Sequence, residues 1–231
     1  MTPLDLARIG RPIEYYPTVD STMRIAAQRA FGTVVVAEEQ TAGQGRHGHA
    51  WHSEPGNGIY CSIVLRPAPV LTLALGLATQ SAIHESTGLV CDLRWPNDVM
   101  LGDKKVAGVL VQLVDGKAIA GIGINVNHTA FPADLEATSL RLSAGRPFSR
   151  EDILRSLLPA VDAFVAESPE SILRLFAHAS SYAAGRRVVV DRPDGIVKGT
   201  TAGLDAAGFL IVRQDDGTDT LILAGGVRAA G

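Results

Sequence analysis

Cysteine is scarce in this chain: its 231 residues contain only Cys61 and Cys91, and neither belongs to a CxxC pair. Cys61 lies in an apolar run, so buried and unreactive thiols are expected. The sequence also lacks an excess of charge of one sign, because 21 basic and 24 acidic residues give a formal net charge of -3. Such a balance provides no electrostatic footprint for nucleic acid. We therefore expect neither DNA binding nor a catalytic cysteine.

Long apolar runs are missing as well. No stretch approaches the length of a membrane span, and the N-terminus shows no charged segment followed by an apolar one. These absences predict a cytoplasmic protein that has no membrane partner. With 46% hydrophobic residues, the chain can bury one full core and add a small second domain.

What the sequence does have is a glycine-rich segment, Gln40 to Gly58, directly after the apolar run Thr33 to Glu39. Its five glycines let backbone NH groups turn toward an anion, and Arg46 adds a permanently charged fork for phosphate or carboxylate. The segment includes a literal GxGxxG, but Pro55 and further glycines exclude the helix that a dinucleotide-binding fingerprint must open. We interpret it as a loop that closes over a charged ligand.

Polar residues stand at the ends of several other predicted elements. Ser21 and Thr22 begin a helix that runs to about Ala30, where they either cap the helix or bind a ligand. In the block RWPNDVMLGDKKVAGVLVQL, Asn97 follows a strand and Lys105 stands where a turn becomes the next strand, a place where lysine is usually solvated. Asn125 lies on the same face of a later strand as a second asparagine, and loop capping and ligand contact both fit it.

The order of elements predicts two domains. Alternating strands and helices occupy residues 1–184, including a buried Ala/Leu-rich helix from Val70 to Thr87 and two later helices that begin after Ser149 and at Pro169. Residues 185–231 contain short strands separated by turn signals, which predicts a small β-barrel.

Four motifs in register, TAGQGRHGHAW, RWPNDVML, KKVAGVLVQ and GIGINVN, resemble those of biotin protein ligases, and DSTM and ATSL fit the same family. The resemblance covers essentially the whole chain. It implies an α+β fold shared with class II aminoacyl-tRNA synthetases, with a C-terminal SH3-like domain, in the short form that lacks an N-terminal DNA-binding winged helix. It implies two chemical steps, in which biotin and ATP with Mg²⁺ give biotinyl-AMP and the biotinyl group then passes to a lysine of a biotin carboxyl carrier domain. It also implies that the protein can form a homodimer through its sheet.

The resemblance assigns roles to particular positions. The residues that match biotin-binding positions are Ser21, Thr22, Met23, Gln40, Gly43, Gln44, Gly45, Arg46, Lys105 and Gly108. The residues that match ATP-binding or adenylate-binding positions are Arg46, His49, Trp51, Asn97, Lys105 and Asn125. Lys105 and Arg46 are the expected catalytic residues, and no protein-bound metal is expected beyond the Mg²⁺ that accompanies ATP.

The chain departs from the family pattern in its loop and in two other places. It has GQGRHGH where the family commonly has GRGRxGR, so Gln44, His47 and His49 replace arginines or similar residues. Met23 stands where asparagine is frequent, so only a backbone contact is carried over to it, and Arg94 stands where lysine is frequent.

Three alternative functions fit parts of the sequence. A lipoate or octanoate ligase has the same fold and adenylation chemistry but lacks the glycine loop and the WPND block. A metal-binding module could use His47, His49 and His52, but a glycine-rich loop without an adjacent cysteine fixes no tetrahedral geometry. A non-enzymatic interaction protein would leave the glycine loop, Lys105 and the asparagines unexplained.

Overall fold

A seven-stranded sheet forms the body of the protein, whose computed structural model describes residues 13–192 and 195–230. Along the sheet the strands run in the order β1-β2-β3-β7-β6-β5-β4, and only β1 and β2 are parallel neighbours. Their bounds are β1 (Ile13–Val19), β2 (Val34–Gln40), β3 (Gly58–Leu65), β4 (Asp92–Arg94), β5 (Asp98–Leu101), β6 (Lys104–Val114) and β7 (Lys117–Asn125). The mixed α+β class predicted from the sequence is therefore confirmed.

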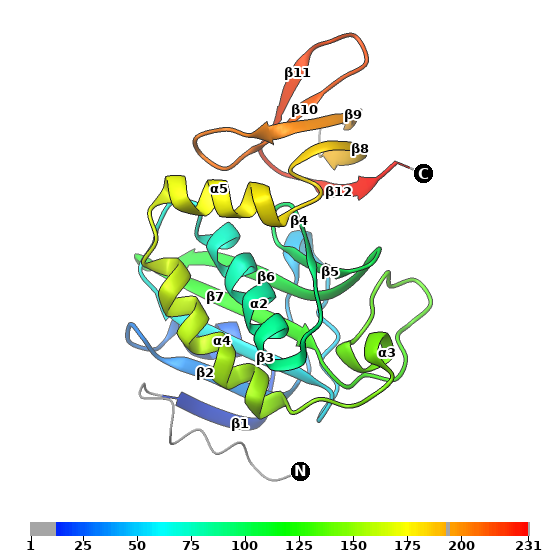
Figure 1. The fold of residues 1–231 in the computed structure, drawn as a ribbon. Helices are drawn as coiled ribbons and strands as arrows, with labels where there is room; N and C mark the ends of the chain where they lie inside the picture. Colours follow the sequence, from blue (N-terminus) through cyan, green and yellow to red (C-terminus); the bar gives the residue numbers. More distant parts are fainter. Residues whose placement is uncertain (1–12, 193–194, 231) are drawn as a thin grey trace.

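The helices cover the two faces of this sheet unequally. Three of them, α2 (Leu71–Thr87), α4 (Arg150–Val165) and α5 (Pro169–Ala179), lie together on one face (Figure 1). The short α1 (Thr22–Ala27) lies on the other face, where Met23 and Ala26 pack against Val35, Val64 and Ile119. A fifth helix, α3 (Leu140–Ala144), follows β7. The face that carries α1 is thus less covered.

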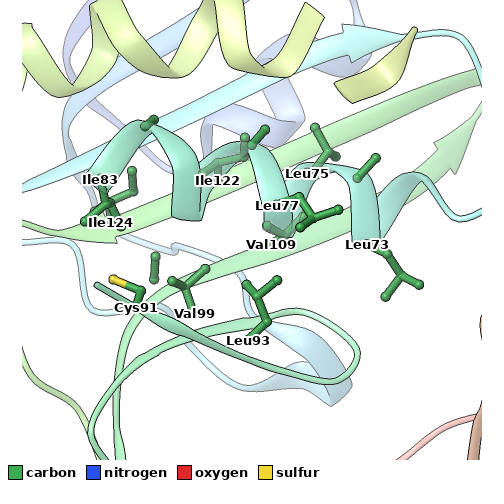
Figure 2. Packing of buried hydrophobic residues seen from close by; sticks show 14 of the residues in the cluster. Leu73, Leu75, Leu77, Ile83, Cys91, Leu93, Val99, Val109, Ile122 and Ile124 are labelled. Atoms are coloured by element: carbon green, nitrogen blue, oxygen red, sulfur yellow. The ribbon is translucent and has the colours of Figure 1, made fainter. Parts of the chain in front are cut away.

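Helix α2 is buried, as its uniformly apolar sequence predicts. Leu73, Leu75 and Leu77 belong to the same buried cluster as Val109 of β6 and Ile122 of β7, and all five lie around the helix (Figure 2). Because alternate residues of a strand face opposite sides of a sheet, every second residue of β6 and β7 faces the core beneath α2. The residues between them face the side of the sheet that carries α1.

Helix capping follows the sequence at one predicted site and departs from it at another. The hydroxyl group of Ser149 accepts a hydrogen bond from the backbone NH of Asp152, as its position predicts, and in the structure Ser168 caps α5 in the same way through the NH of Ser171. Ser21 stands at the N-cap of α1 but its side chain accepts no capping bond. Its predicted position is correct, whereas its hydroxyl group is left for another partner.

A second, five-stranded antiparallel sheet occupies the C-terminal part of the chain, with the order β11-β10-β9-β8-β12. Its strands are β8 (Ala184–Arg192), β9 (Gly195–Leu204), β10 (Leu210–Arg213), β11 (Asp219–Ile222) and β12 (Gly226–Ala229). Within the described residues its edge strands do not pair with each other, so the predicted barrel is an open sheet here. The sheet lies at one end of the molecule (Figure 1), and the Trp95 indole NH donates to the Gly208 carbonyl at 2.9 Å. The domain division at 184/185 stays a prediction.

The two thiols are buried, and burial raises the pKa of both Cys61 and Cys91 to about 12. Relative to the ordinary value of 9.0, the thiolate fraction at a given pH is about a thousandfold smaller. We expect a thiol reagent at pH 8 to leave the native protein unlabelled while both cysteines react rapidly in guanidinium. Rapid labelling of a native thiol would contradict the assignment of both as inert core residues. Across the described ranges, no helix is long and apolar enough to cross a membrane.

Candidate functional site

The less covered face of the sheet carries a row of glycines on its two longest strands. Gly108 of β6 and Gly121 and Gly123 of β7 alternate with core residues and so face the side of α1. A Cβ atom at Gly121 would lie 2.8 Å from Met23 Sδ, and one at Gly108 would lie 2.7 Å from Lys105 Cε. Glycine is needed here because other groups pack directly on the backbone.

Trp51 covers this glycine surface. A Cβ atom at Gly123 would overlap the Trp51 ring, and the Lys105 ammonium lies 5.3 Å from the ring centroid. The loop reaches this position through a bridge between Gln44 and Ala50 and a short 3₁₀ turn, η2 (Arg46–Gly48). The predicted loop is therefore an ordered cover in the structure.

A chain of side-chain hydrogen bonds fastens the two ends of the loop to α1. Gln40 Oε1 accepts bonds from the Thr22 backbone NH at 2.9 Å and from its hydroxyl group at 3.0 Å. The Gln40 amide donates to Ser53 Oγ at 3.0 Å, and Ser53 donates to the Trp51 carbonyl at 3.0 Å. Gly43 is buried beneath this chain, and a Cβ atom there would lie 2.6 Å from the Trp51 carbonyl oxygen. The network fixes where Trp51 sits.

Between α1, the loop and the glycine surface lies a first hollow of about 440 Å³, open mouth included. Its lining combines apolar residues with hydroxyl and amide groups. It also includes two cations, Arg46 and Lys105, and none of the described lining residues is a carboxylate. Two buried polar atoms of its lining, Ser21 Oγ and Trp51 Nε1, have no hydrogen-bond partner in the described part of the chain. Buried polar groups are nearly always satisfied, so this pair indicates a missing polar ligand.

A second hollow lies on the other side of Trp51. Its lining includes His49, Asn125 and Phe131, together with Arg94 and Asp98. The Asn125 amide donates to the Thr138 carbonyl at 3.1 Å, which holds the end of β7 against the segment that leads into α3. Five residues line both hollows: Gly45, Arg46, Trp51, Asn97 and Lys105.

Lys105 forms an ion pair with Asp98. Asp98 also accepts from Arg94 at 2.8 Å. Burial by itself raises the pKa of Asp98, but Lys105 and Arg94 outweigh it and hold that pKa below its usual range. A carboxylate at the junction of the hollows therefore compensates two cations until a ligand competes for them.

Arg46 is held by a neutral partner. Its guanidinium donates to Asn97 Oδ1 at 3.0 Å, and the Asn97 amide in turn donates to the Val109 carbonyl at 2.9 Å. Burial lowers the pKa of Arg46, with nearby Asp98 opposing the shift. Since the ordinary pKa of arginine is so high, the group remains a cation, and it stands at the junction with spare donors for an anionic ligand.

The structure brings together nearly all the residues that the resemblance singles out. Those predicted to bind biotin line the first hollow, with the exception of Gly43: Ser21, Thr22, Met23, Gln40, Gln44, Gly45, Arg46, Lys105 and Gly108. Those predicted to bind the nucleotide line the second hollow: Arg46, His49, Trp51, Asn97, Lys105 and Asn125. Gly43 instead gives the loop room to pass beneath Trp51. Met23, from which only a backbone contact was expected, packs its own side chain over Gly121.

Sequence reasoning missed several residues of the site. Asp98 has no role predicted from the sequence, yet it pairs with Lys105 across the β5–β6 hairpin. Ser53 carried no motif, and its bond to Gln40 depends on the path of the loop. Gly121 and Gly123 were recognisable as small residues, and their alternation with Ile122 and Ile124 is the signal that could have placed them on the open face.

The site offers chemistry of one kind. A ligand with an apolar body fits the first hollow, and its anionic end would lie near Arg46 and Lys105, which also border the second hollow. Two bound molecules could therefore bring anionic groups to the same pair of cations, whose charge would favour a reaction between them. The buried cysteines lie in no reactive setting, so the cations carry the chemistry that this arrangement supports.

Two family models match the chain. The model described as the biotin/lipoate A/B protein ligase family matches residues 15–128, and the one described as the biotin protein ligase C-terminal domain matches residues 184–227. Residues that line both hollows lie in the first matched region. The five-stranded C-terminal sheet largely coincides with the second matched region.

The chain is similar to proteins of known name and to a solved structure. The chain is 31% identical to the bifunctional ligase/repressor BirA of Bacillus subtilis, over 90% of this chain and 71% of that protein. It is 32% identical to the biotin--[acetyl-CoA-carboxylase] ligase of Mycobacterium tuberculosis, over 84% of this chain and 77% of that protein. Its structure is similar to that of the Aquifex aeolicus biotin protein ligase in complex with biotin and ATP, with a TM-score of 0.86 and 31% identity. The match covers 95% of this chain and 99% of that chain.

Proposed function

The chain belongs to the biotin protein ligase family, and from this premise we propose that it uses ATP to form biotinyl-AMP and transfers the biotinyl group to a lysine of a biotin carboxyl carrier domain. Proteins of known name to which it is similar include biotin--[acetyl-CoA-carboxylase] ligases. A carboxylase subunit is therefore the acceptor that we propose.

One observation supports placing this reaction at the site described above: the two hollows meet at Arg46 and Lys105. A carboxylate and an α-phosphate are both anions, so bringing them within reach of each other requires positive charge at the place where they meet. The hollow beside α1 would hold biotin, and the hollow beyond Trp51 would hold the nucleotide.

In the first hollow, the glycine surface would take the apolar part of biotin. Ser21 Oγ and Trp51 Nε1, both buried without a partner in the described residues, would bond to its polar atoms. Thr22, Gln40 and Gln44 line the same hollow, and the first two hold the loop through their own hydrogen bonds. The biotin carboxylate would point toward Arg46 and Lys105.

In the second hollow, Asn97 and Asn125 would position the nucleotide, with Trp51 and His49 beside it. ATP would enter as its Mg²⁺ complex, so the metal belongs to the substrate. Asp98 would give up its ion pair with Lys105 as the phosphates arrive.

The two steps need no enzyme nucleophile. A carboxylate oxygen of biotin attacks the α-phosphorus, the bond to the β-phosphate oxygen breaks and pyrophosphate leaves. The acceptor lysine amine then attacks the acyl carbon of the anhydride, AMP leaves and the amine loses its proton. Positioning and charge stabilisation account for such chemistry. Homodimer formation, a cytoplasmic location and the absence of DNA binding stay predictions of the sequence.

The test is transfer to a carrier domain. The full-length chain with MgATP, biotin and a biotin carboxyl carrier domain should add one biotinyl group to the acceptor lysine, detected by mass spectrometry. Replacing biotin by lipoate and the carrier by a lipoyl domain should give no modification. Modification of the lipoyl domain instead would favour the lipoate ligase alternative, and no transfer to either would contradict the proposal.

A further inference from the structure

A cluster outside the residues assigned so far combines two histidines and a glutamate. His52 and Glu54 belong to the end of the glycine loop, and His128 follows β7. Gly58 pairs with Asn125 in the β3–β7 ladder, so the segment entering β3 and the segment leaving β7 emerge at the same edge of the sheet. One potential ligand atom from each of the three side chains lies within 4.8 Å of the others.

The three side chains differ in burial. His128 is fully buried, its carbonyl accepts from Ser139 at 2.7 Å, and its ring stacks on Phe131 at 5.0 Å. The side chains of His52 and Glu54 are 33% and 48% exposed, and His52 Nε2 lies 3.1 Å from Glu54 Oε1. The cluster therefore has one fixed member and two that can adjust.

The hydrogen bonds of Tyr60 indicate the protonation of His128. The Tyr60 hydroxyl group has one proton, which it donates to the Glu54 carbonyl at 2.9 Å. Its contact of 3.3 Å with His128 Nε2 then requires Nε2–H to be the donor. His128 Nδ1 is left as a buried lone pair with no partner in the described residues.

We propose that His52, Glu54 and His128 form a binding site for a divalent transition-metal ion of the Zn²⁺ class. Neutral imidazole nitrogens with one carboxylate suit such ions, whereas Mg²⁺ prefers all-oxygen sites. Tyr60 takes the place of the outer hydrogen-bond acceptor that orients a ligating histidine. The site differs from the three loop histidines, His47, His49 and His52, for which the sequence predicts no metal binding.

Binding requires a small contraction of the cluster. Bonds of about 2.1 Å in tetrahedral geometry place the donor atoms about 3.4 Å apart, so the cluster must close from 4.8 Å. The partly exposed His52 and Glu54 would move, while His128 stays. A bound ion would join the end of the glycine loop, at His52 directly after Trp51, to the segment that follows β7. We therefore also expect a higher melting temperature.

The experiment uses the full-length protein after chelator treatment, with Co²⁺ as a spectroscopic probe and Zn²⁺ in calorimetry. We expect one ion per chain and a visible Co²⁺ absorption band typical of four or five ligands. His52→Ala and Glu54→Gln should each weaken binding by at least about tenfold, and Tyr60→Phe, which keeps all three ligands, by about 10- to 100-fold. His49→Ala removes another histidine of the same loop and should leave the affinity unchanged.

Two outcomes would overturn the site. In one, His52→Ala binds as tightly as the unmodified chain. In the other, Co²⁺ keeps the weak spectrum of the hydrated ion. Since the readout is metal affinity, failure here leaves the proposed ligase activity untouched, and failure of biotin transfer leaves the metal site untouched. His128→Gln is avoided as the main variant because the side chain is fully buried.

Discussion

Lys105→Ala should lower the rate of adenylate formation by about 10² to 10³, because one preorganised charge that meets the developing transition state typically contributes that much. Lys105 lines both hollows, and its ammonium lies 5.3 Å from the centroid of the Trp51 ring. The measurement is pyrophosphate release with biotin and MgATP. Lys104→Ala is the matched control, because the adjacent lysine is exposed and lines neither hollow.

Among the described residues, removing Lys105 also leaves Asp98 paired with Arg94 alone in a buried place. This incompletely paired carboxylate would by itself repel ATP and destabilise the fold. The double variant Lys105→Ala, Asp98→Asn removes that charge and should remain as slow as the single variant. Recovery of the rate in the double variant, or wild-type pyrophosphate release in the single one, would show that Lys105 does not stabilise the reacting groups.

Arg46→Gly should release biotinyl-AMP faster than it impairs its synthesis. Arg46 borders both hollows, and its hydrogen-bond partner within residues 13–192 and 195–230 is the neutral Asn97, so we expect its other donors to bind the phosphate of the adenylate. A charged hydrogen bond contributes about 1.5 to 3 kcal/mol, which corresponds to roughly ten- to a hundredfold in residence time. The escaped anhydride would then acylate nearby amines. The measurement is biotin incorporation into a bystander protein without a carrier domain, at matched adenylate production.

Two further variants separate charge from flexibility. Arg46→Gln removes the cation without adding a glycine and should leak like Arg46→Gly, whereas Arg66→Gln alters an arginine that lines neither hollow and should not leak. If only the glycine variant leaks, loop flexibility rather than the cation retains the intermediate. Equal or lower bystander labelling by both Arg46 variants would remove Arg46 from this role.

The sequence predicted most of the elements, because their signals are local. Apolar β-branched runs gave the strands around the glycine loop, and Ser149 caps the helix that it was expected to cap. The motifs in register also identified the family, and all of the site residues they singled out except Gly43 line one or both hollows. These inferences need only residue type and spacing.

What the sequence by itself determined is therefore the order of elements, the family and the two cations of the site, since each depends on residues close together in the chain or on motifs in register. The tertiary structure decided which groups face one another. Only the pairing of β5 with β6 brings Asp98 to Lys105, and only the β3–β7 register places His128 beside His52. Ser21 shows the same division, because its position at a helix start is local, whereas its unpartnered hydroxyl depends on the strands and loop that bury it. Contacts of this kind arise from strand pairing between distant segments, and no local pattern specifies them.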